Sequence, residues 1–377
     1  MSKSLFIVVL FAALLIQGCS NARPSLPSPP SIDSKVDLHT SWRKGVDGNF
    51  GESSERFNLV AENGSLFFVT EKGTLYELNQ ENGKEKRALS TDYKPSAGVT
   101  RNGDILYFGT YDAQLVAVSL ESQSVLWEKT LSSEILAEAS YAAGKLAVQT
   151  ADGWLNLLDA GTGEILWRAK EDLPSLTVRG TSAPIISNGK VISGSADGQL
   201  RAFSLQDGSL LWSYEIGKPE GRYEIERLSD IDGRLVAKNG VVYSVAYNGT
   251  LAAISIESGR LLWQRNISSS VGVAVKGELL AVVDMKSKVI LLNAKNGAEI
   301  WENETLVERD LISPEFFRDY VAVIDRAGYV HLLDLTTGDV VAHKIADNDV
   351  SPGSRMVTND KQLFILTPKS NVTALSY

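Results

Sequence analysis

The chain has 377 residues, which is too many for one ordinary compact core. Hydrophobic residues make up 44% and charged residues 22%, which excludes a disordered chain and a polytopic membrane protein. The net charge of −9 and the absence of a long basic run argue against nucleic-acid binding. One cysteine excludes an intrachain disulfide, and three histidines argue against a histidine-rich metal or acid–base centre.

Residues 1–18 have the pattern of a secretory signal peptide. Lys3 supplies a positive start, and residues 5–16 form an apolar stretch too short to span a bilayer comfortably. The stretch ends in Ile-Gln-Gly-Cys, which resembles the bacterial lipobox, so we expect Cys19 to be lipidated and to become the new N-terminus. Ser20 follows the cysteine where inner-membrane lipoproteins usually carry Asp, which indicates the outer membrane of a Gram-negative bacterium.

Residues 19–36 are expected to be the lipidated cysteine and a tether rich in proline and serine. The prolines at 24, 27, 29 and 30 predict a stiff, extended segment. At about 3 Å per residue, the tether could hold a domain up to about 50 Å from the membrane. We therefore expect a periplasmic body that is attached to the membrane through its covalent lipid.

The body, residues 37–377, repeats one pattern of short strands and turns. The residue two positions after the first turn glycine, or its equivalent, marks each unit: Leu75, Leu115, Leu155, Leu200, Leu251, Val289, Val330 and Val372. Their spacings are 40, 40, 45, 51, 38, 41 and 42 residues. A period of about 42 residues with about four strands per unit predicts a β-propeller, and the length of the body accommodates eight units.

Turn and tryptophan positions support this repeat. Asp-Gly at 152–153 and 197–198 and Asn-Gly at 248–249 predict two-residue hairpin turns in which both residues have φ > 0. A second turn carries glycine at 83, 163, 208, 259, 297 and 338. A tryptophan four residues after the second turn recurs at 127, 167, 212, 263 and 301, whereas blades one and seven carry Arg87 and Ala342 there.

The predicted fold class is therefore all-β, an eight-bladed propeller with four-stranded antiparallel blades. The eighth unit stops before any tryptophan strand, so we expect residues 38–46, with Trp42, to complete it beside 371–377 and to close the ring. A linear solenoid would need polar caps, and both ends of this body are strand-like. Trp154 is out of phase with the repeat, and its interpretation stays open between a surface contact and ordinary packing.

The segment NLLDAGTGEILW, residues 156–167, resembles the tryptophan-docking repeat of quinoprotein alcohol and glucose dehydrogenases. Those enzymes are eight-bladed propellers that use pyrroloquinoline quinone, but the resemblance is to the scaffold motif rather than to the catalytic centre. After lipidation no cysteine remains for the two-cysteine ring that covers the quinone in methanol dehydrogenase types, and six blades are near minimal length. We therefore expect no catalytic residue, metal or cofactor; the alternative is a quinone-dependent dehydrogenase or a ligand-binding propeller.

The whole chain is more similar to the propeller lipoproteins of the outer-membrane β-barrel assembly machine. The most specific segments are residues 174–184, PSLTVRGTSAP, and residues 224–232, EIERLSDID. The two long repeat spacings independently place extra residues at about 168–184 and 217–235, on either side of blade four. Both insertions connect the outer strand of one blade to the inner strand of the next, so we expect them side by side on one face.

This resemblance implies a non-catalytic scaffold that docks on the periplasmic POTRA domains of BamA. It also implies contacts with other subunits of the assembly machine and help in folding and inserting unfolded outer-membrane proteins. The residues that carry over are Leu176, Val178, Arg179, Asp230 and Asp232, and the mixture of apolar and charged groups adds Arg227 and Leu228. Alternatively, Arg179 and Asp230 pair with each other and only shape the loops. Exposed edge strands offer a further way to pair with a substrate strand, without a distinctive residue pattern.

Overall fold

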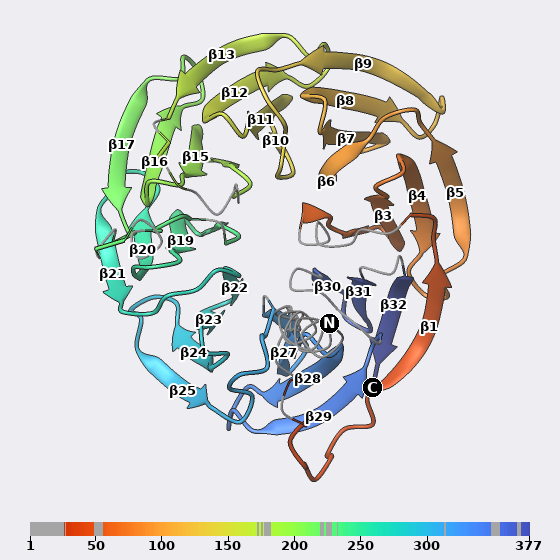
Figure 1. The fold of residues 1–377 in the computed structure, drawn as a ribbon, viewed down its shortest axis with the longest axis vertical. Helices are drawn as coiled ribbons and strands as arrows, with labels where there is room; N and C mark the ends of the chain where they lie inside the picture. Colours follow the sequence, from red (N-terminus) through yellow and green to blue (C-terminus); the bar gives the residue numbers. More distant parts are fainter. Residues whose placement is uncertain are drawn as a thin grey trace, which may run out of the picture.

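The computed structural model describes residues 26, 28–48, 56–171, 173–174, 176, 182–218, 222–223, 228–231, 233–312, 314–347, 355–367 and 371–377. Within these residues the chain forms eight four-stranded antiparallel sheets, arranged as blades around a central axis (Figure 1). The described residues contain no α-helix, and thus none long and apolar enough to cross a membrane. The expected all-β, eight-bladed propeller is confirmed.

The strands follow each other from the axis outwards in every blade. Blade one comprises β2 (Val60–Glu62), β3 (Ser65–Val69), β4 (Thr74–Asn79) and β5 (Glu85–Ser90); blade two β6 (Pro95–Asn102), β7 (Ile105–Thr110), β8 (Gln114–Ser119) and β9 (Ser124–Thr130). Blade three comprises β10 (Ser140–Ala142), β11 (Lys145–Gln149), β12 (Trp154–Asp159) and β13 (Ile165–Lys170); blade four β14 (Ile185–Ser187), β15 (Lys190–Gly194), β16 (Gln199–Ser204) and β17 (Leu210–Glu215). Blade five comprises β18 (Val236–Lys238), β19 (Val241–Val245), β20 (Leu251–Ser255) and β21 (Leu261–Arg265); blade six β22 (Val273–Lys276), β23 (Leu279–Val283), β24 (Val289–Asn293) and β25 (Glu299–Asn303). Blade seven comprises β26 (Glu315–Phe317), β27 (Tyr320–Ile324), β28 (Tyr329–Asp334) and β29 (Val340–Ile345).

Blade eight joins the two ends of the described chain. Its first three strands are β30 (Met356–Thr358), β31 (Leu363–Thr367) and β32 (Asn371–Ser376), and its outer strand is β1 (His39–Gly45). β1 pairs antiparallel with β32, with Trp42 opposite Ala374 (Figure 1). The predicted closure of the ring by the N-terminal strand is therefore confirmed.

The hairpin turns differ from the prediction. At 152–153 and 197–198 only the glycine has positive φ, and at 248–249 neither residue does. Gly153 follows a turn closed by its amide donating to the Thr150 carbonyl, which is the pattern of a type I turn followed by a left-handed glycine. Turns with both residues at positive φ lie instead between the first and second strands of the blades, as at Asn63-Gly64 and Asn239-Gly240.

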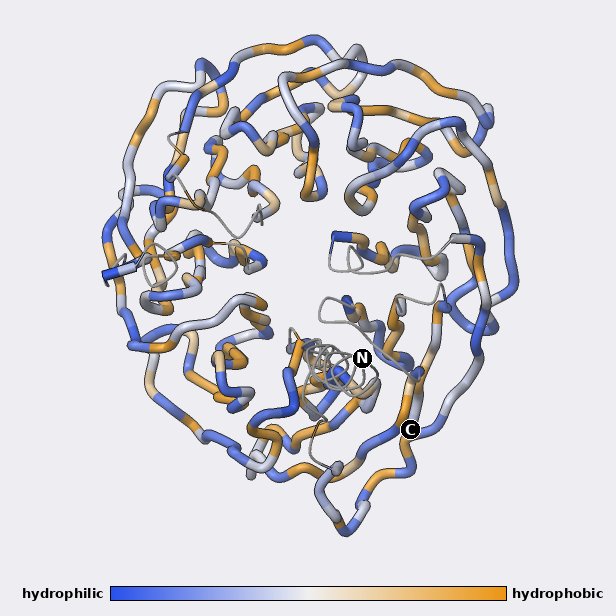
Figure 2. The backbone as a smooth tube through the Cα atoms, in the orientation of Figure 1, coloured by the Kyte–Doolittle hydropathy of each residue, from blue (hydrophilic) through white to orange (hydrophobic). Residues whose placement is uncertain are grey.

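The core is a ring of clusters rather than one centre. Each cluster straddles a joint between neighbouring blades; one, for example, combines Ile192 and Leu200 of blade four with Val242 and Ile254 of blade five. The two middle strands of a blade are covered on both faces, so they are almost continuously apolar, whereas the outer strands mix hydrophobic and hydrophilic stretches (Figure 2). A long chain thus folds without a single large core, because each blade packs on its neighbours.

A tryptophan on six of the eight outer strands locks one blade to the next. Its indole Nε1 donates to a main-chain carbonyl of the following blade: Trp42 to Gln80 at 2.8 Å, Trp127 to Ala160 at 3.1 Å, Trp167 to Leu205 at 3.2 Å, Trp212 to Ile256 at 3.0 Å, Trp263 to Ala294 at 2.9 Å and Trp301 to Leu335 at 3.0 Å. Its ring lies on the second-turn glycine of that following blade. A Cβ on Gly163, for example, would stand 2.6 Å from the Trp127 ring.

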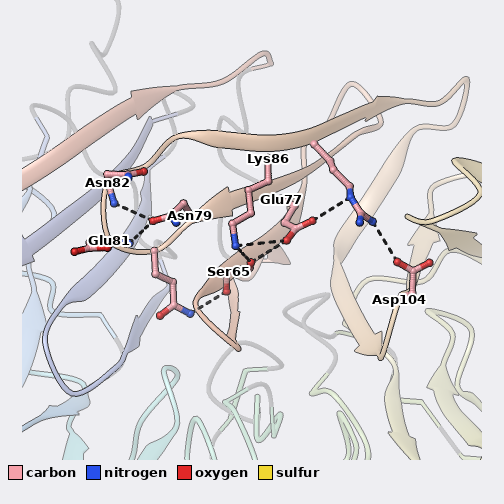
Figure 3. Close-up of polar contacts among 9 residues, drawn as sticks. Ser65, Glu77, Asn79, Glu81, Asn82, Lys86 and Asp104 are labelled. Atoms are coloured by element: carbon pink, nitrogen blue, oxygen red, sulfur yellow. Dashed lines mark hydrogen bonds and ion pairs between the residues drawn. The ribbon is translucent and has the colours of Figure 1, made fainter.

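The joint between blades one and two replaces the tryptophan with ion pairs. Arg87 stands in the tryptophan position, and Gln123 of blade two stands where the receiving glycine would be. The Arg87 guanidinium bridges Glu77 at 3.5 Å and Asp104 of blade two at 3.3 Å (Figure 3). The tryptophan and the glycine that would receive its ring are thus absent together: without an indole at this joint, position 123 does not need a glycine.

The joint between blades seven and eight uses the segment before β1. Ala342 occupies the tryptophan position of blade seven, and Leu38 is buried in the cluster that contains Ala342. The amide of Lys35 donates to the Val341 carbonyl at 2.9 Å. Residues 35–38 therefore fill the space that an indole fills at six other joints.

Candidate protein-docking surface

The two insertions lie on the same face of the ring, because each follows an outer strand and precedes an inner one. They meet over blade four at Gly194, where a Cβ would stand 2.5 Å from the Ile231 side chain and 2.9 Å from the Ser182 Oγ. Ser182 belongs to the first insertion and Ile231 to the second. The described parts of the two insertions are therefore neighbours, as the repeat spacings predicted.

Hydrogen bonds hold the second insertion against blade five. The Lys218 amide donates to the Asn248 carbonyl at 2.7 Å, and the Asn248 side-chain amide donates to the Leu228 carbonyl at 2.7 Å. Gly249 forms an antiparallel bridge with Gly217, and the backbones approach so closely that a Cβ on Gly249 would meet the Ile216 carbonyl. Glycine at 249 is needed for this approach rather than for a positive φ.

Three large side chains of the insertions project into solvent. Leu173, Leu176 and Tyr223 are 43%, 41% and 68% exposed, respectively. Leu228, which follows Tyr223 in the second insertion, is half-buried. We call these four residues the rim surface. Among the predicted site residues, only Leu176, Leu228 and Asp230 are described; Val178, Arg179, Arg227 and Asp232 lie outside the described residues.

Asp230 is buried, with 1% of its surface exposed. Its backbone carbonyl accepts the Tyr247 amide at 3.0 Å, and the next amide, of Ile231, donates to the Ser195 carbonyl at 3.3 Å. Asp230 thus lies in the stretch that fixes the second insertion to blades four and five. Its burial favours a role in shaping the loop over direct exposure to a partner.

Glu171 anchors the start of the first insertion, a role that the repeat pattern did not reveal. Its carboxylate accepts hydrogen bonds from Gln149 at 2.7 Å and from Ser193 at 2.5 Å, joining blades three and four. Burial raises the pKa of Glu171, while the Ser193 hydrogen bond and the charge of Arg201 act in the opposite direction. A carboxylate directly after an outer strand was the only available signal for this anchor.

Trp154, whose interpretation the sequence left open, carries two cations on its ring. The Arg168 guanidinium lies 4.6 Å and the Lys170 ammonium 5.1 Å from the indole centroid. Leu173 is close by, because a Cβ on Gly153 would stand 3.1 Å from it. Trp154 is thus a half-buried platform next to the rim surface.

Ion pairs join the inner ends of non-neighbouring blades on the same face. Arg355, just before the inner strand of blade eight, pairs with Glu138, just before the inner strand of blade three. Arg234 of blade five lies 3.9 Å from Glu315 of blade seven. Burial alone would raise the pKa of Glu138, but the charge and hydrogen bond of Arg355 lower it overall.

Two of the three histidines come together in blade seven around a buried carboxylate. His331 Nε2 lies 2.9 Å from Asp325 Oδ2, which also accepts Arg309 Nε at 2.7 Å; all three side chains are buried. His343 is the cross-strand neighbour of His331. Within the described residues, no group of three or more His, Cys, Asp or Glu side chains could hold a metal ion. Arg309 follows blade six, so this cluster ties blade six to blade seven.

The chain is similar to known proteins over nearly its whole length. The family model described as "Outer membrane protein assembly factor BamB" matches residues 85–303. A relative with the same name from Yersinia pestis is 29% identical over 377 residues, covering 96% of each chain. The crystal structure of BamB from Moraxella catarrhalis superposes with a TM-score of 0.80 at 23% identity, covering 90% of this chain and 100% of that one.

Quinoproteins share the fold at a greater distance. A europium-containing methanol dehydrogenase superposes with a TM-score of 0.68 but at 10% identity, covering 90% of this chain and 93% of that one. At this identity the likeness concerns the fold alone. The family model, in contrast, covers more than half of the chain and includes both insertions. The chain belongs to the BamB family of outer membrane protein assembly factors.

Proposed function

We propose that this protein is an outer-membrane protein assembly factor without catalytic activity, which docks through its rim surface on the periplasmic POTRA domains of BamA. The observation that carries the proposal is the pairing of the two insertions over blade four, which presents Leu173, Leu176 and Tyr223 to solvent. Exposed aromatic and aliphatic side chains are typical of protein interfaces. The name of the relatives supports the same role.

The ion pairs between the inner ends of the blades support a non-catalytic role. The Glu138–Arg355 pair links blades three and eight, which are not neighbours, so it crosses the axis. Arg234 and Glu315 approach each other between blades five and seven. A planar quinone between these residues would have to displace both pairs and take the arginine away from two largely buried carboxylates, Glu138 and Glu315, which is costly. The residues present therefore do not fit a quinone site at this place.

The point at which residues 35–38 join the ring and the insertions that carry the rim surface lie on opposite sides of the ring (Figure 1). Residues 35–38 enter at blades seven and eight, and the insertions flank blade four (Figure 1). Once the proposed signal peptide (1–18) is removed, the lipid on Cys19 and the tether (19–36) would attach the ring at the first of these sites. The protein would then hang from the outer membrane in the periplasm, with its docking side turned away from its own anchor.

The direct test is binding of the unlipidated body, residues 20–377, to the purified POTRA region of BamA. Leu176→Asp and Arg179→Glu are expected to weaken binding about tenfold or more, which corresponds to 1.4 kcal/mol. Asp230→Ala is expected to weaken it by loosening the second insertion. Met285→Asp is the matched control, because Met285 is 46% exposed on a blade-six turn of the same face.

Each variant would be checked for native circular dichroism and an unchanged Tm. Equal affinities for wild type, Leu176→Asp and Arg179→Glu would refute docking through the rim surface. Equal weakening by Met285→Asp would show that the effect is not specific to the insertions.

A further inference from the structure

Trp154 lies at a position where the propeller does not need an indole. It stands directly before Leu155, the residue that marks the third repeat, and the other seven blades carry Thr, Gln, Lys, Tyr or Asn at the same position. The tryptophans that lock neighbouring blades together lie on the outer strands instead. Seven blades thus form the same four-stranded sheet without this indole, so the fold alone does not account for Trp154.

Two cations of the outer strand β13 lie on the ring of Trp154. Lys170 is the cross-strand partner of Trp154, and Arg168 precedes Lys170 by two residues, so the three side chains share one face of blade three. The Arg168 guanidinium lies 4.6 Å and the Lys170 ammonium 5.1 Å from the indole centroid. The face of an indole attracts cations, so the ring holds both side chains in place. We call these three residues the cationic platform.

The charge of the cationic platform is not neutralised. Arg168 and Lys170 are both exposed, and in the part of the chain that the structure describes neither forms an ion pair. Lys170 donates a hydrogen bond to the Asp152 carbonyl, whereas no described group accepts one from the Arg168 side chain. An indole has no net charge. Two positive charges and most of their N–H donors therefore face solvent, in a protein whose net charge is −9.

Blade six has the opposite arrangement at the same three positions. Lys288 takes the position of the indole, and Glu302 and Glu304 take the positions of the two cations. The Lys288 Nζ lies 3.3 Å from the Glu302 carboxylate and 2.6 Å from the Glu304 carboxylate. Blade six thus supplies a counter-ion from its own strands. Blade three does not, and no other blade has a cation at both of these outer-strand positions.

The cationic platform is continuous with the rim surface. The first insertion leaves β13 directly after Lys170 (Figure 1). Gly153, which precedes Trp154, lies so close to Leu173 that a Cβ on it would stand 3.1 Å from that side chain. Leu173 is itself 43% exposed. An exposed apolar side chain and two cations without counter-ions therefore lie next to each other, which is complementary to an apolar surface bordered by carboxylates.

We propose that the cationic platform extends the docking surface and binds an acidic patch of the protein that docks on the rim surface. Arg168 and Lys170 are two residues apart on one strand, about 7 Å, which matches two carboxylates of similar separation. The platform would speed the encounter with the acidic patch and fix the orientation in which the rim surface is covered. This inference rests on the proposed function, which names BamA as the docking protein.

The first test is binding of the full-length protein to full-length BamA at several salt concentrations. Arg168→Gln/Lys170→Gln is expected to weaken binding about threefold to tenfold at low salt, mostly through slower association, and to make the affinity less dependent on salt. The matched control is Lys286→Gln/Lys295→Gln, which removes the same charge from exposed positions of blade six and is expected to bind like wild type. Equal weakening by the two double variants would overturn the proposal, because net charge alone would then explain the effect.

Leu176→Asp separates this inference from the proposed docking. Weaker binding by Leu176→Asp, together with unchanged affinity and salt dependence in a folded Arg168→Gln/Lys170→Gln variant, would overturn the role of the cationic platform and leave the docking in place. Full binding by Leu176→Asp would overturn the docking itself, and with it the partner named for the platform.

Carbodiimide crosslinking of the unmodified complex tests the chemistry of the partner without any variant. The reagent joins an amine to a carboxylate that touches it, with no spacer between them. We expect mass spectrometry of the digested complex to find the Lys170 amine joined to an Asp or Glu of BamA. This product is expected to disappear in Lys170→Arg, which keeps the positive charge but has no primary amine. Absence of a Lys170 product from the wild-type complex, or its presence only with apolar segments lacking Asp and Glu, would overturn the proposal.

Discussion

At the scale of single residues, glycine and tryptophan act as one unit across a joint. The second-turn glycines have φ between 67° and 76° and also lie under an indole of the preceding blade. Left-handed backbone explains part of the need for glycine, and the indole explains the rest. These two contributions can be separated, because other glycines in the ring have the same φ and no neighbour.

Gly163→Ala is expected to destabilise the protein more than Gly144→Ala. Both glycines have φ above 70°, so both variants carry the strain of a left-handed non-glycine residue, about 1 kcal/mol. At Gly163 the new Cβ would also stand 2.6 Å from the Trp127 ring, whereas at Gly144 nothing lies within 4 Å. We expect an additional cost of about 1–3 kcal/mol at Gly163.

Urea denaturation of both variants would measure this difference as a change of midpoint. Equal midpoints would mean that the indole moves aside without cost, and that the docking contact is not a constraint on residue 163.

Glu171 links stability to pH at the base of the first insertion. Its pKa is raised by burial, so the folded state retains the proton to a higher pH than the unfolded state does. The resulting stabilisation is complete below the unfolded pKa of about 4.5 and is lost as pH rises through the folded pKa. Glu171→Gln removes this titration, so its free energy of unfolding should fall less than that of wild type as pH rises above 4.5.

The measurement is urea denaturation of both proteins at several pH values from 4 upwards. Parallel pH profiles for wild type and Glu171→Gln would show that this carboxylate does not titrate differently in the folded state.

At the scale of elements, the eight joints are not equivalent. Six use a tryptophan, one uses the ion pairs of Arg87, and one uses residues 35–38. Repeat spacing predicted the blades and the closing strand, because each strand pattern is local. The repeat pattern relates each tryptophan to the glycine four residues before it in its own blade. Only the structure shows that the tryptophan ring lies on the glycine of the next blade.

Trp212→Ala is expected to cost about 3–5 kcal/mol, because it removes a large ring and its hydrogen bond to Ile256. Arg87→Ala is expected to cost less than about 1 kcal/mol, because the Arg87 side chain is 40% exposed and its ion pairs are screened by water. Thermal unfolding of the two variants decides between them, and a larger loss for Arg87→Ala would reverse this ranking of the joints.

Part of the candidate site could not have been predicted from the chain. The Glu138–Arg355 pair joins residues 217 positions apart, and no local pattern marks either one. Asp230 is a charged residue in a predicted interface segment, but it is buried. Its burial depends on how the insertion folds back over blades four and five, which the sequence does not show. The insertions themselves were predictable, since extra residues lengthen the repeat.

At the scale of the whole molecule, the segment before β1 has two roles: it ends the expected membrane tether and closes the ring. Leu38 is buried against Ala342, where other joints hold an indole. Leu38→Ala is therefore expected to lower the free energy of unfolding by about 2–5 kcal/mol. Leu173→Ala, at an exposed leucine of the rim surface, should change it by about 0.5 kcal/mol or less.

Calorimetry of the two leucine variants tests this assignment. If Leu38→Ala unfolds at the same temperature as Leu173→Ala, residues 35–38 contribute to tethering alone and the ring closes without them.

The central claim is that the rim surface docks on BamA, and photo-crosslinking in the living bacterium tests it most directly. A photoreactive residue at position 176 would be compared with one at position 285, on the same face but outside the insertions. We expect a crosslinked product containing BamA from position 176 and none from position 285. Absence of BamA from the product at position 176, or equal products from both positions, would contradict the proposed docking.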